Sequence, residues 1–289
     1  MRKIQFTLLL MCIMFASQAQ MKELKIISYN IYVGMKTDTT ANKHVFSEWF
    51  RKQDADVVGL QEVTGFTQSS LEEWARSYGH RYAVLLIEGE KYPVAFTSKY
   101  PITGVQKVTD NMDRGFIQAT IGGQTFIVLH LSPFDYRTRR TEVDLLLAHV
   151  KNQPQITDWV LMGDFNSFSS VDSLAYRDGR LKENLRKYEA KYPPYKKLID
   201  NKIDYQVIDE VLAAGFSDAL KIHHPEFVKT VHPRRFEPKQ GRDVPTRIDY
   251  IFVSKRFSSR VTKAEVIVDQ FTDNHSDHYP MMMKLKLKR

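Results

Sequence analysis

The sequence has a single cysteine and, for its length, few glycines and prolines. Cys12 is the only cysteine among 289 residues, beside 13 glycines and 11 prolines. One cysteine excludes an intramolecular disulfide and a metal site built from several thiolates. So few glycines and prolines exclude collagen-like and low-complexity proteins. No linker-like stretch or repeat divides the chain after its N-terminal segment, so we expect one domain over residues 20–289.

The N-terminal segment has the features of a signal peptide. Two basic residues precede an apolar run from Ile4 to Ala16, which is shorter than the roughly 20 residues needed to span a bilayer. Ser17 and Ala19 place small residues where a signal peptidase reads, so we expect cleavage after Ala19 and removal of residues 1–19. The mature chain would then lack cysteine and lie in the periplasm or outside the cell. An uncleaved anchor or a buried N-terminal helix is the alternative.

The composition is that of a globular protein with a moderate positive charge. Hydrophobic residues make up 43% of the chain and charged residues 26%, which is enough apolar material for a sizeable core. Lys and Arg number 42 against 34 Asp and Glu, for a net charge of +8. This excess suits partners that carry phosphate, although ordinary secreted proteins can be as basic. No second apolar run of membrane length follows Ala19.

Short apolar runs predict many strands and few helices. In Lys43–Gln53 and Arg139–Val150, the apolar residues fall on one helical face. The helices are too irregularly spaced for a βαβ repeat, so we expect a mixed sheet or two packed sheets with helices outside. The predicted strands are Leu24–Tyr32, Val57–Leu60, Ala83–Ile87, Val94–Thr97, Thr125–Leu131, Trp159–Met162, Ile248–Val253, Ala264–Val268 and Met281–Leu287.

Polar side chains stand at the ends of three of these strands. Asn30 and Glu62 each follow an apolar stretch, where a carboxylate is costly unless it is solvated, paired or bound to a metal. Glu62 is a candidate Mg²⁺ ligand, because Mg²⁺ takes one or two carboxylates and fills its octahedron with waters and phosphate. A solvated strand end is the alternative. His130 ends another strand, and a structural role is the plainer interpretation of a single histidine.

Acidic, amide and imidazole groups also lie in or next to three later strands. If the chain stays extended after Gly163, Asp164 and Asn166 lie on one face, where they could hold a water and a phosphoryl oxygen. An Asx turn is the alternative, because both residues favour turns. Asp249 lies in a later predicted strand, and an acid followed by His278 precedes the last one. An acid that orients an imidazole is typical of acid–base or phosphate chemistry.

Taken together, these segments resemble the endonuclease/exonuclease/phosphatase superfamily. This group includes pancreatic-type DNases, exonuclease III-like abasic-site nucleases, neutral sphingomyelinases and inositol polyphosphate phosphatases. The resemblance spans Ile26 to Pro280. It implies a four-layer α/β sandwich, with two mixed sheets face to face, helices outside and the site at one edge. The motifs are Ser28-Tyr29-Asn30, Leu60-Gln61-Glu62, Leu129-His130-Leu131, Gly163-Asp164-Phe165-Asn166, Arg247-Ile248-Asp249-Tyr250-Ile251 and Ser276-Asp277-His278.

The resemblance also implies a role for each polar residue. Glu62 would be the principal Mg²⁺ ligand, with Asn30 and Asp277 beside the metal and Mn²⁺ as a possible substitute. Asp164 would align or deprotonate the attacking water, and Asn166 would steady the pentacovalent phosphorane.

The two histidines would serve the phosphate and the leaving group. His278, oriented by Asp249, would stabilise the phosphate or shuttle a proton. His130 would bind a non-bridging oxygen or serve the leaving group. A positioned water, charge neutralisation and a proton route are what phosphate ester hydrolysis needs, without a covalent nucleophile.

Weaker candidates for substrate binding are Arg114, His232 and Arg234. Arg114 matches a phosphate-facing arginine of relatives, and a solvated strand-edge arginine is the alternative. His232 and Arg234 could rim the site or belong to a plain surface loop. Arg137, Arg139 and Arg140 cluster after the His130 loop, where they could bind phosphates or solvate the loop.

We therefore expect an exported, monomeric, Mg²⁺-dependent phosphohydrolase, foremost a phosphodiesterase acting on nucleic acid. The same chemistry on a phospholipid headgroup or a sugar or inositol phosphate is the second hypothesis. A non-catalytic binding protein on this fold is the third, and it would have no need for the whole polar set.

Overall fold

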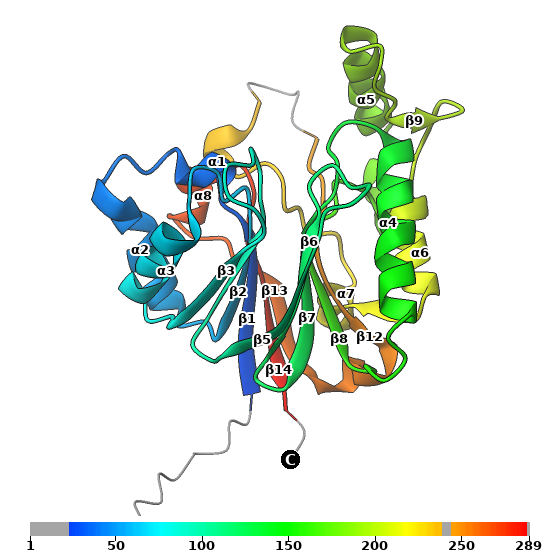
Figure 1. Cartoon of the computed structure of the whole chain (residues 1–289). Helices are drawn as coiled ribbons and strands as arrows, with labels where there is room; N and C mark the ends of the chain where they lie inside the picture. The colour runs from blue at the N-terminus through cyan, green and yellow to red at the C-terminus, as the bar shows by residue number, and fades with distance from the viewer. Residues whose placement is uncertain (1–22, 239–243, 288–289) are drawn as a thin grey trace, which may run out of the picture.

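The computed structural model describes residues 23–238 and 244–287. In these residues, two six-stranded mixed sheets face each other and helices cover their outer sides (Figure 1). The predicted four-layer α/β sandwich is therefore confirmed. The predicted signal peptide lies outside the described residues.

The first sheet carries the N-terminal strand at its centre. Its order is β13-β14-β1-β2-β4-β3, with β1 and β2 parallel and all other neighbours antiparallel. The strands are β1 Glu23–Asn30, β2 Val57–Gln61, β3 Tyr82–Leu85, β4 Ala95–Ser98, β13 Val261–Val266 and β14 Met281–Lys286.

The second sheet repeats this plan with one parallel pair at its centre. Its order is β11-β12-β8-β7-β6-β5, and only β7 and β8 among these neighbours are parallel. The parallel pairs of both sheets end at the same edge of the molecule (Figure 1). The strands are β5 Ile102–Val108, β6 Phe116–Ile121, β7 Gln124–His130, β8 Trp159–Asp164, β11 Phe216–Asp218 and β12 Asp249–Ser254; β9 Leu198–Ile199 and β10 Lys202–Ile203 form a separate pair.

The helices divide between the two outer faces. α2 and α3 pack on the first sheet through Phe46, Trp49 and Trp74, and α4 and α6 pack on the second through Val143 and Val207. α5 stands with β9 beyond the sheet edge (Figure 1), and β10 pairs with β9. The helices are α1 Tyr32–Met35, α2 His44–Gln53, α3 Gln68–Ser77, α4 Tyr136–Lys151, α5 Arg180–Lys191, α6 Gln206–Ala213, α7 Ala219–His223 and α8 Thr272–His275; 3₁₀ turns span Ala41–Lys43, Ser170–Tyr176, Arg234–Phe236 and Lys255–Arg260.

Alternation along the strands explains three separate apolar layers. On β7, Phe126 and Val128 point into the core between the sheets, whereas Ile127 and Leu129 point to the helices outside. β1 divides its side chains in the same way, with Ile26 inside and Ile27 outside. Because both faces of each central strand are buried, these strands are continuously apolar in the sequence, and that is why they could be predicted.

The predicted strands and helices all overlap observed ones, but β5, β6 and β11 of the two large sheets were not predicted. β6 lies inside its sheet and is almost wholly buried, but Gln118 and Thr120 interrupt its apolar run. β5, which ends one sheet, was not predicted because its Ile102–Val108 segment is largely exposed and polar. Helix α4 begins at Tyr136, earlier than predicted, because the Asp135 side chain accepts a hydrogen bond from the backbone N–H of Arg137 at 2.8 Å.

A buried hydrogen-bond chain under the first sheet depends on a neutral histidine. His80 Nε2 lies 2.8 Å from the carbonyl of Ala55, and Nδ1 lies 2.9 Å from the hydroxyl of Thr97. The Tyr78 hydroxyl lies 2.7 Å from that same Thr97 oxygen. The carbonyl can only accept, so Nε2 donates to it, and Nδ1 is left to accept from Thr97. Burial lowers the pKa of His80 to about 4.

We predict an acid-sensitive contribution of His80 to stability. The pKa in the folded chain is below that of the unfolded chain, so the contribution is complete above about pH 6.5 and is lost as the pH falls toward 4. One such group changes the unfolding free energy by at most ~1.4 kcal/mol per pH unit. Urea unfolding at pH 7 and pH 4.5 should show a smaller acid loss for His80→Gln than for the wild type. The exposed His44→Gln is the control, and an equal loss in all three chains would contradict the assignment.

Candidate active site

Three ionisable side chains form a row across the end of the second sheet. His130 at the end of β7 is the register partner of Asp164 at the end of β8, and Asp164 is the partner of Asp249 at the start of β12. Register partners on neighbouring strands point to the same face of a sheet. All three are almost completely buried, at 1%, 2% and 3% exposure. The strand pairing therefore brings together groups that are far apart in the sequence.

The first sheet supplies the facing half of the site. Asn30 ends β1, Glu62 follows β2, and His278 precedes β14. Asn30 Nδ2 donates to Asp164 Oδ2 at 3.3 Å, and His278 Nδ1 lies 2.8 Å from Asp249 Oδ2. These two hydrogen bonds join the sheets at the edge where the parallel pairs end.

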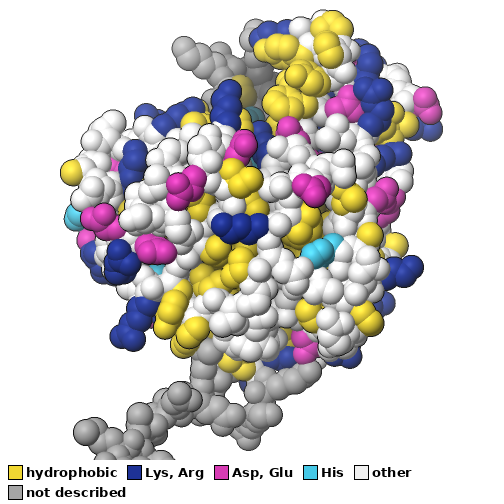
Figure 2. Space-filling model, in the orientation of Figure 1, with side chains coloured by type: hydrophobic (Ala, Val, Ile, Leu, Met, Phe, Trp, Pro, Cys, Tyr) yellow, Lys and Arg dark blue, Asp and Glu magenta, His cyan; other side chains and the backbone are white. Residues whose placement is uncertain are grey.

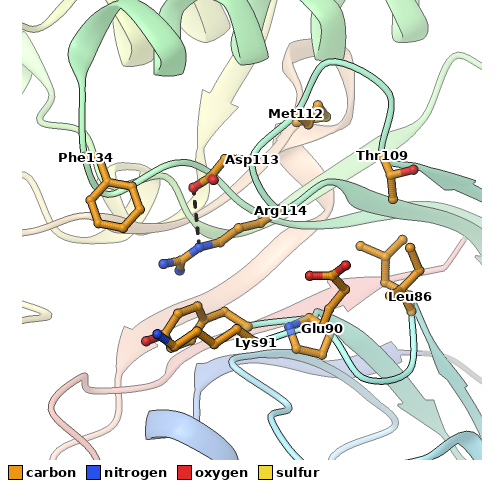
Figure 3. A pocket seen from close by; sticks show the side chains of 11 residues that line it. Leu86, Glu90, Lys91, Thr109, Met112, Asp113, Arg114 and Phe134 are labelled. Carbon is orange, nitrogen blue, oxygen red and sulfur yellow. Dashed lines mark ion pairs between the residues drawn. The ribbon is translucent and has the colours of Figure 1, made fainter. Parts of the chain in front are cut away.

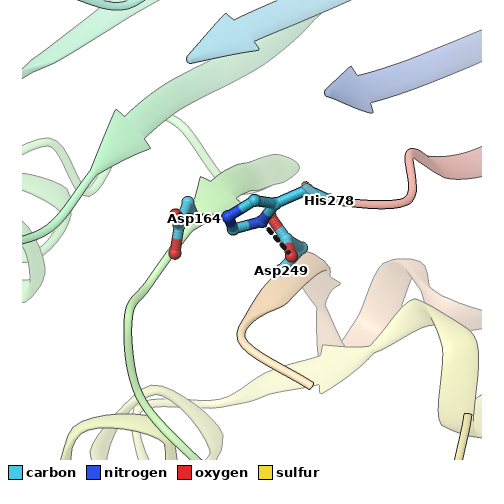
Figure 4. Close-up of side chains that lie close together, drawn as sticks. All are labelled: Asp164, Asp249 and His278. Carbon is cyan, nitrogen blue, oxygen red and sulfur yellow. Dashed lines mark hydrogen bonds and ion pairs between the residues drawn. The ribbon is translucent and has the colours of Figure 1, made fainter. Parts of the chain in front are cut away.

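The Asp164 carboxylate lies between two imidazoles. His130 Nε2 is 3.3 Å and His278 Nε2 is 3.8 Å from Asp164 Oδ2. Figure 4 shows the ring of His278 between Asp164 and Asp249, bonded to the latter. His278 is thus oriented by Asp249, as the sequence predicted.

Electrostatics in this buried cluster favour the charged forms of two groups. Burial opposes ionisation of Asp164, but His130 and His278 outweigh it and hold the pKa of Asp164 below its usual range. Burial likewise opposes a charged His278, but Asp249 and Asp164 raise its pKa well above the usual value. Burial raises the pKa of Asp249, and His278 counteracts this. The cluster can therefore present an ionised acid beside a protonated imidazole.

The chain turns sharply after Asp164 and does not continue as an extended segment to Asn166. The backbone N–H of Asn166 donates to Asp164 Oδ1 at 2.8 Å, and Asn166 has a left-handed backbone with φ of 49°. Of the two alternatives that the sequence left open, the Asx turn is therefore correct and the extended segment is wrong, because β8 ends at Asp164. Asn166 Nδ2 donates to the carbonyl of Leu131 at 2.9 Å, so this turn is joined to the loop after His130.

Gly163 is required where β8 passes β7. Its φ is 149°, and a Cβ atom there would lie 2.0 Å from the carbonyl oxygen of Leu129. A side chain would therefore force apart the strands that carry His130 and Asp164. Glu62 also has a left-handed backbone, with φ of 61°, a conformation uncommon for a glutamate and frequent at functional sites.

The predicted metal ligands fit a hard divalent cation. Glu62 Oε2 accepts from the backbone N–H of Val33 at 2.8 Å, which fixes the carboxylate. Burial and the charge of Glu62 both raise the pKa of Asp277, so these two carboxylates repel each other. A cation between them would relieve that repulsion, and oxygen ligands suit Mg²⁺ or Mn²⁺.

A second set of potential ligands is already engaged in hydrogen bonding. One ligand atom each from Asp164, Asp249 and His278 lies within 4.8 Å of the others. Because Nδ1 of His278 is bonded to Asp249, this set is better suited to moving and holding protons than to enclosing an ion.

Arg114 lies at the site, so its interpretation as a solvated strand-edge arginine is wrong. Its Nη1 is 2.9 Å from His130 Nδ1, and its guanidinium lies over the ring of Tyr92 at 4.3 Å. His232 is close enough for its charge to lower the pKa of Asp277, against the larger effect of burial. Arg234 is exposed in the 3₁₀ turn Arg234–Phe236.

The arginine cluster after His130 is engaged in structural contacts. Arg137 pairs with Asp135 at 2.7 Å and Arg140 with Asp204 at 2.8 Å. Arg139 is buried, and its Nη1 donates to the carbonyl of Ser132. Figure 2 shows Lys and Arg side chains interspersed with Asp and Glu over the visible face. These three arginines thus do not form the open phosphate-binding cluster that the sequence suggested.

Sequence reasoning missed a buried glutamate that joins two site loops. Glu142 on α4 is fully buried, and its oxygens accept from the backbone N–H groups of Asp113 and Ser132, each at 2.8 Å. Burial raises the pKa of Glu142 to about 7, although both hydrogen bonds oppose this shift. Asp113 precedes Arg114 and Ser132 follows the His130 strand, so one carboxylate fixes both. Only the helical position of Glu142 facing the sheet could have signalled this role.

Arg247 was also missed as a structural anchor. It is fully buried, and it donates to Asp172 at 2.6 Å and to Asp218 at 2.5 Å. Its guanidinium also lies 4.4 Å from the ring centre of Tyr250. These contacts fix the chain two residues before Asp249, which explains an arginine inside an otherwise apolar motif.

Within residues 23–238 and 244–287, no helix has both the length and the apolar character needed to cross a bilayer. A comparison of the sequence with curated proteins found no match.

Solved structures share the fold. An AP endonuclease from Archaeoglobus fulgidus is similar with a TM-score of 0.68 at 17% identity, over 91% of this chain and 100% of that one. A 3′ phosphatase from Neisseria bound to a product DNA hairpin has a TM-score of 0.67 at 17% identity, with the same coverage. An endonuclease/exonuclease/phosphatase from Beutenbergia cavernae has a TM-score of 0.61 at 16% identity, over 92% of this chain and 72% of that one.

The sequence itself identifies the family. The model of the Endonuclease/Exonuclease/phosphatase family matches residues 27–278, which include every residue of the cluster described above. The chain therefore belongs to the endonuclease/exonuclease/phosphatase family, and it is a hydrolase of phosphate ester bonds.

Proposed function

We propose that the chain is an exported, Mg²⁺-dependent phosphodiesterase that cleaves nucleic acid by direct attack of water. The observation that carries the chemistry is the position of the buried Asp164 carboxyl group between His130 and His278 at the end of a strand. Export is inferred from the basic, apolar and small-residue segments of positions 1–19.

In this mechanism the scissile phosphate lies against His130 and His278. Asp164 accepts a hydrogen bond from the attacking water and aligns it with phosphorus. As the bond from the water oxygen to phosphorus forms, the bond to the ester oxygen breaks, the ester oxygen takes a proton from solvent, and the water gives its proton to Asp164. Its lowered pKa makes it a weak base, so alignment is its main contribution. His278, held protonated by Asp249 and Asp164, donates to a phosphoryl oxygen as negative charge develops there.

The remaining groups act on the metal and on the leaving side. Glu62, Asn30 and Asp277 would hold Mg²⁺, which when bound neutralises charge on the non-bridging oxygens. Arg114 donates toward the oxygens next to His130. The second N–H of the Asn166 amide is available to a phosphoryl oxygen, because the first is used by Leu131.

The substrate assignment rests on charge and on similarity. Without Arg2 and Lys3 of the proposed signal peptide the net charge falls from +8 to +6, which still favours polyanions, and the similar structure from Neisseria is bound to a DNA product. The ion pairs of Arg137 and Arg140 with acidic neighbours point the other way, because they remove positive charge from one rim. A sugar, inositol or phospholipid headgroup phosphate is therefore the second candidate.

We predict that loss of either central group abolishes most activity. Asp164→Ala and His278→Ala should each lower kcat by at least ~10²-fold, because each removes a group that contacts the reacting phosphate or water. The assay uses the mature chain from Gln20 with plasmid DNA, RNA, an abasic-site duplex, sphingomyelin, inositol phosphates and a chromogenic phosphodiester. Each substrate is run with Mg²⁺ and with EDTA.

The controls are the exposed substitutions Asp178→Ala and His44→Ala, which should keep wild-type rates. Nicking of plasmid that EDTA abolishes would support the nuclease. Release from only a lipid or sugar phosphate would replace the substrate and keep the mechanism. Wild-type rates for folded Asp164→Ala and His278→Ala would show that the site is wrongly assigned.

We predict a positioning role for Glu142. Glutamine offers one acceptor oxygen where two backbone N–H groups need partners, so Glu142→Gln should leave one buried donor unsatisfied, at a cost of about 1–3 kcal/mol. The resulting displacement of Arg114 and His130 should lower kcat about 10-fold.

The matched control is Asp144→Asn, an exposed position on the same helix. A double-mutant cycle separates positioning from general destabilisation. If Glu142 acts through Arg114, Glu142→Gln should cost much less in an Arg114→Ala background. Full additivity of the two losses would contradict this role.

A further inference from the structure

A cavity of about 660 Å³ lies beside the catalytic cluster, between the loops that follow β3 and β5. Its walls include Leu86, Ile87 and Tyr92 from the first loop, Met112 and Arg114 from the second, and Phe134 from the loop before α4. Figure 3 shows Phe134 and Met112 on one side, Leu86 and Lys91 on the other, and Arg114 reaching between them. This volume is typical of sites that enclose a small organic group.

Arg114 belongs to both the cavity and the catalytic cluster. It lines the cavity, forms an ion pair with Asp113 at 3.8 Å and lies over the ring of Tyr92. Its Nη1 also contacts His130, which in turn lies 3.3 Å from Asp164. A phosphate bound at His130 would therefore have one of its two ester substituents at the mouth of this cavity.

The lining selects for an uncharged and flat or apolar group. Leu86, Ile87, Met112 and Phe134 offer apolar contacts, and the Phe134 ring is held by stacking on Tyr195 at 4.9 Å.

The charges around the cavity balance each other. Lys91 and Arg114 are offset by Glu90 and Asp113, so the cavity lacks the surplus of positive charge that a second phosphate would need. An aromatic ring can instead stack on or lie edge-on to Phe134 and Tyr92.

We propose that this cavity is the subsite for an uncharged aromatic group, of the size of a nucleobase, carried by one ester substituent of the phosphate that is cleaved. The inference rests on the proposed function and adds the selectivity of its site: a diester with one aromatic substituent is preferred over one with a small aliphatic substituent.

Binding of phosphonates tests the cavity without catalysis. Phenylphosphonate and methylphosphonate carry the same anionic group, and neither contains an ester that can be cleaved. Calorimetric titration of the wild-type chain in Mg²⁺ should give a Kd about 10-fold lower for phenylphosphonate. Ile87→Ser should bring the two Kd values together. Ile222→Ser should preserve the ratio, because Ile222 is similarly exposed, 39% against 36%, but lies on α7.

Turnover supplies the second measurement. Bis(4-nitrophenyl) phosphate and methyl 4-nitrophenyl phosphate release the same product and differ in the substituent that remains. Because the aryl diester has two equivalent leaving groups and is intrinsically more reactive, each kcat/KM is divided by the rate constant of the uncatalysed reaction per leaving group before the two are compared. The wild type should have a higher kcat/KM for the aryl diester, and both Ile87→Ser and Met112→Ser should lower that value while leaving the methyl diester within about 2-fold.

The two failures can be told apart. Cleavage of both diesters with equal kcat/KM, together with equal Kd values for the phosphonates, would overturn the cavity assignment and leave the phosphodiesterase standing. Absence of cleavage of any diester would overturn the proposed function, and the inference with it.

Discussion

A carboxylate held out of water between two imidazoles is the interaction on which the site depends. An isolated ion at the position of Asp164 would be strongly disfavoured by burial, and it is tolerated because His130, His278 and Asn30 all face it. The partners come from both sheets. The strands of the two sheets that carry these groups must therefore end at a common edge of the molecule, and the parallel pairs β1–β2 and β7–β8 do so.

This arrangement requires unusual backbone conformations near the cluster and additional buried charged groups. Gly163 permits the close approach of β8 to β7, and left-handed residues at Glu62 and Asn166 turn the chain at the strand ends. Behind the cluster, Glu142 satisfies two loop N–H groups and Arg247 is enclosed by two aspartates. The site is thus rigid because its supports are buried and hydrogen bonded, which is the condition for electrostatic stabilisation of a transition state.

The sequence predicted the part of this structure that local patterning encodes. Central strands such as β7 and β8 are apolar on both faces, so their runs and the polar residues ending them are visible, and His130, Asp164 and Asp249 do meet. β5 was missed because an exposed edge strand carries no such pattern. Glu142 and Arg247 were missed because their partners are distant backbone or acidic groups, which no local signal specifies. The sequence left an extended segment and an Asx turn at Asn166 as two open alternatives, since propensity alone does not decide where a strand ends.

Net charge alone does not identify the substrate of this protein, because several of its arginines are buried or paired with acidic side chains. Arg139 and Arg247 are buried, and the charges of Arg137 and Arg140 are offset by paired aspartates. Arg114 is different, because it faces His130 and lines a cavity whose other charges cancel. Recognition is then concentrated on one phosphate and on the uncharged group beside it. Such a site can distinguish substrates by the shape of a single substituent.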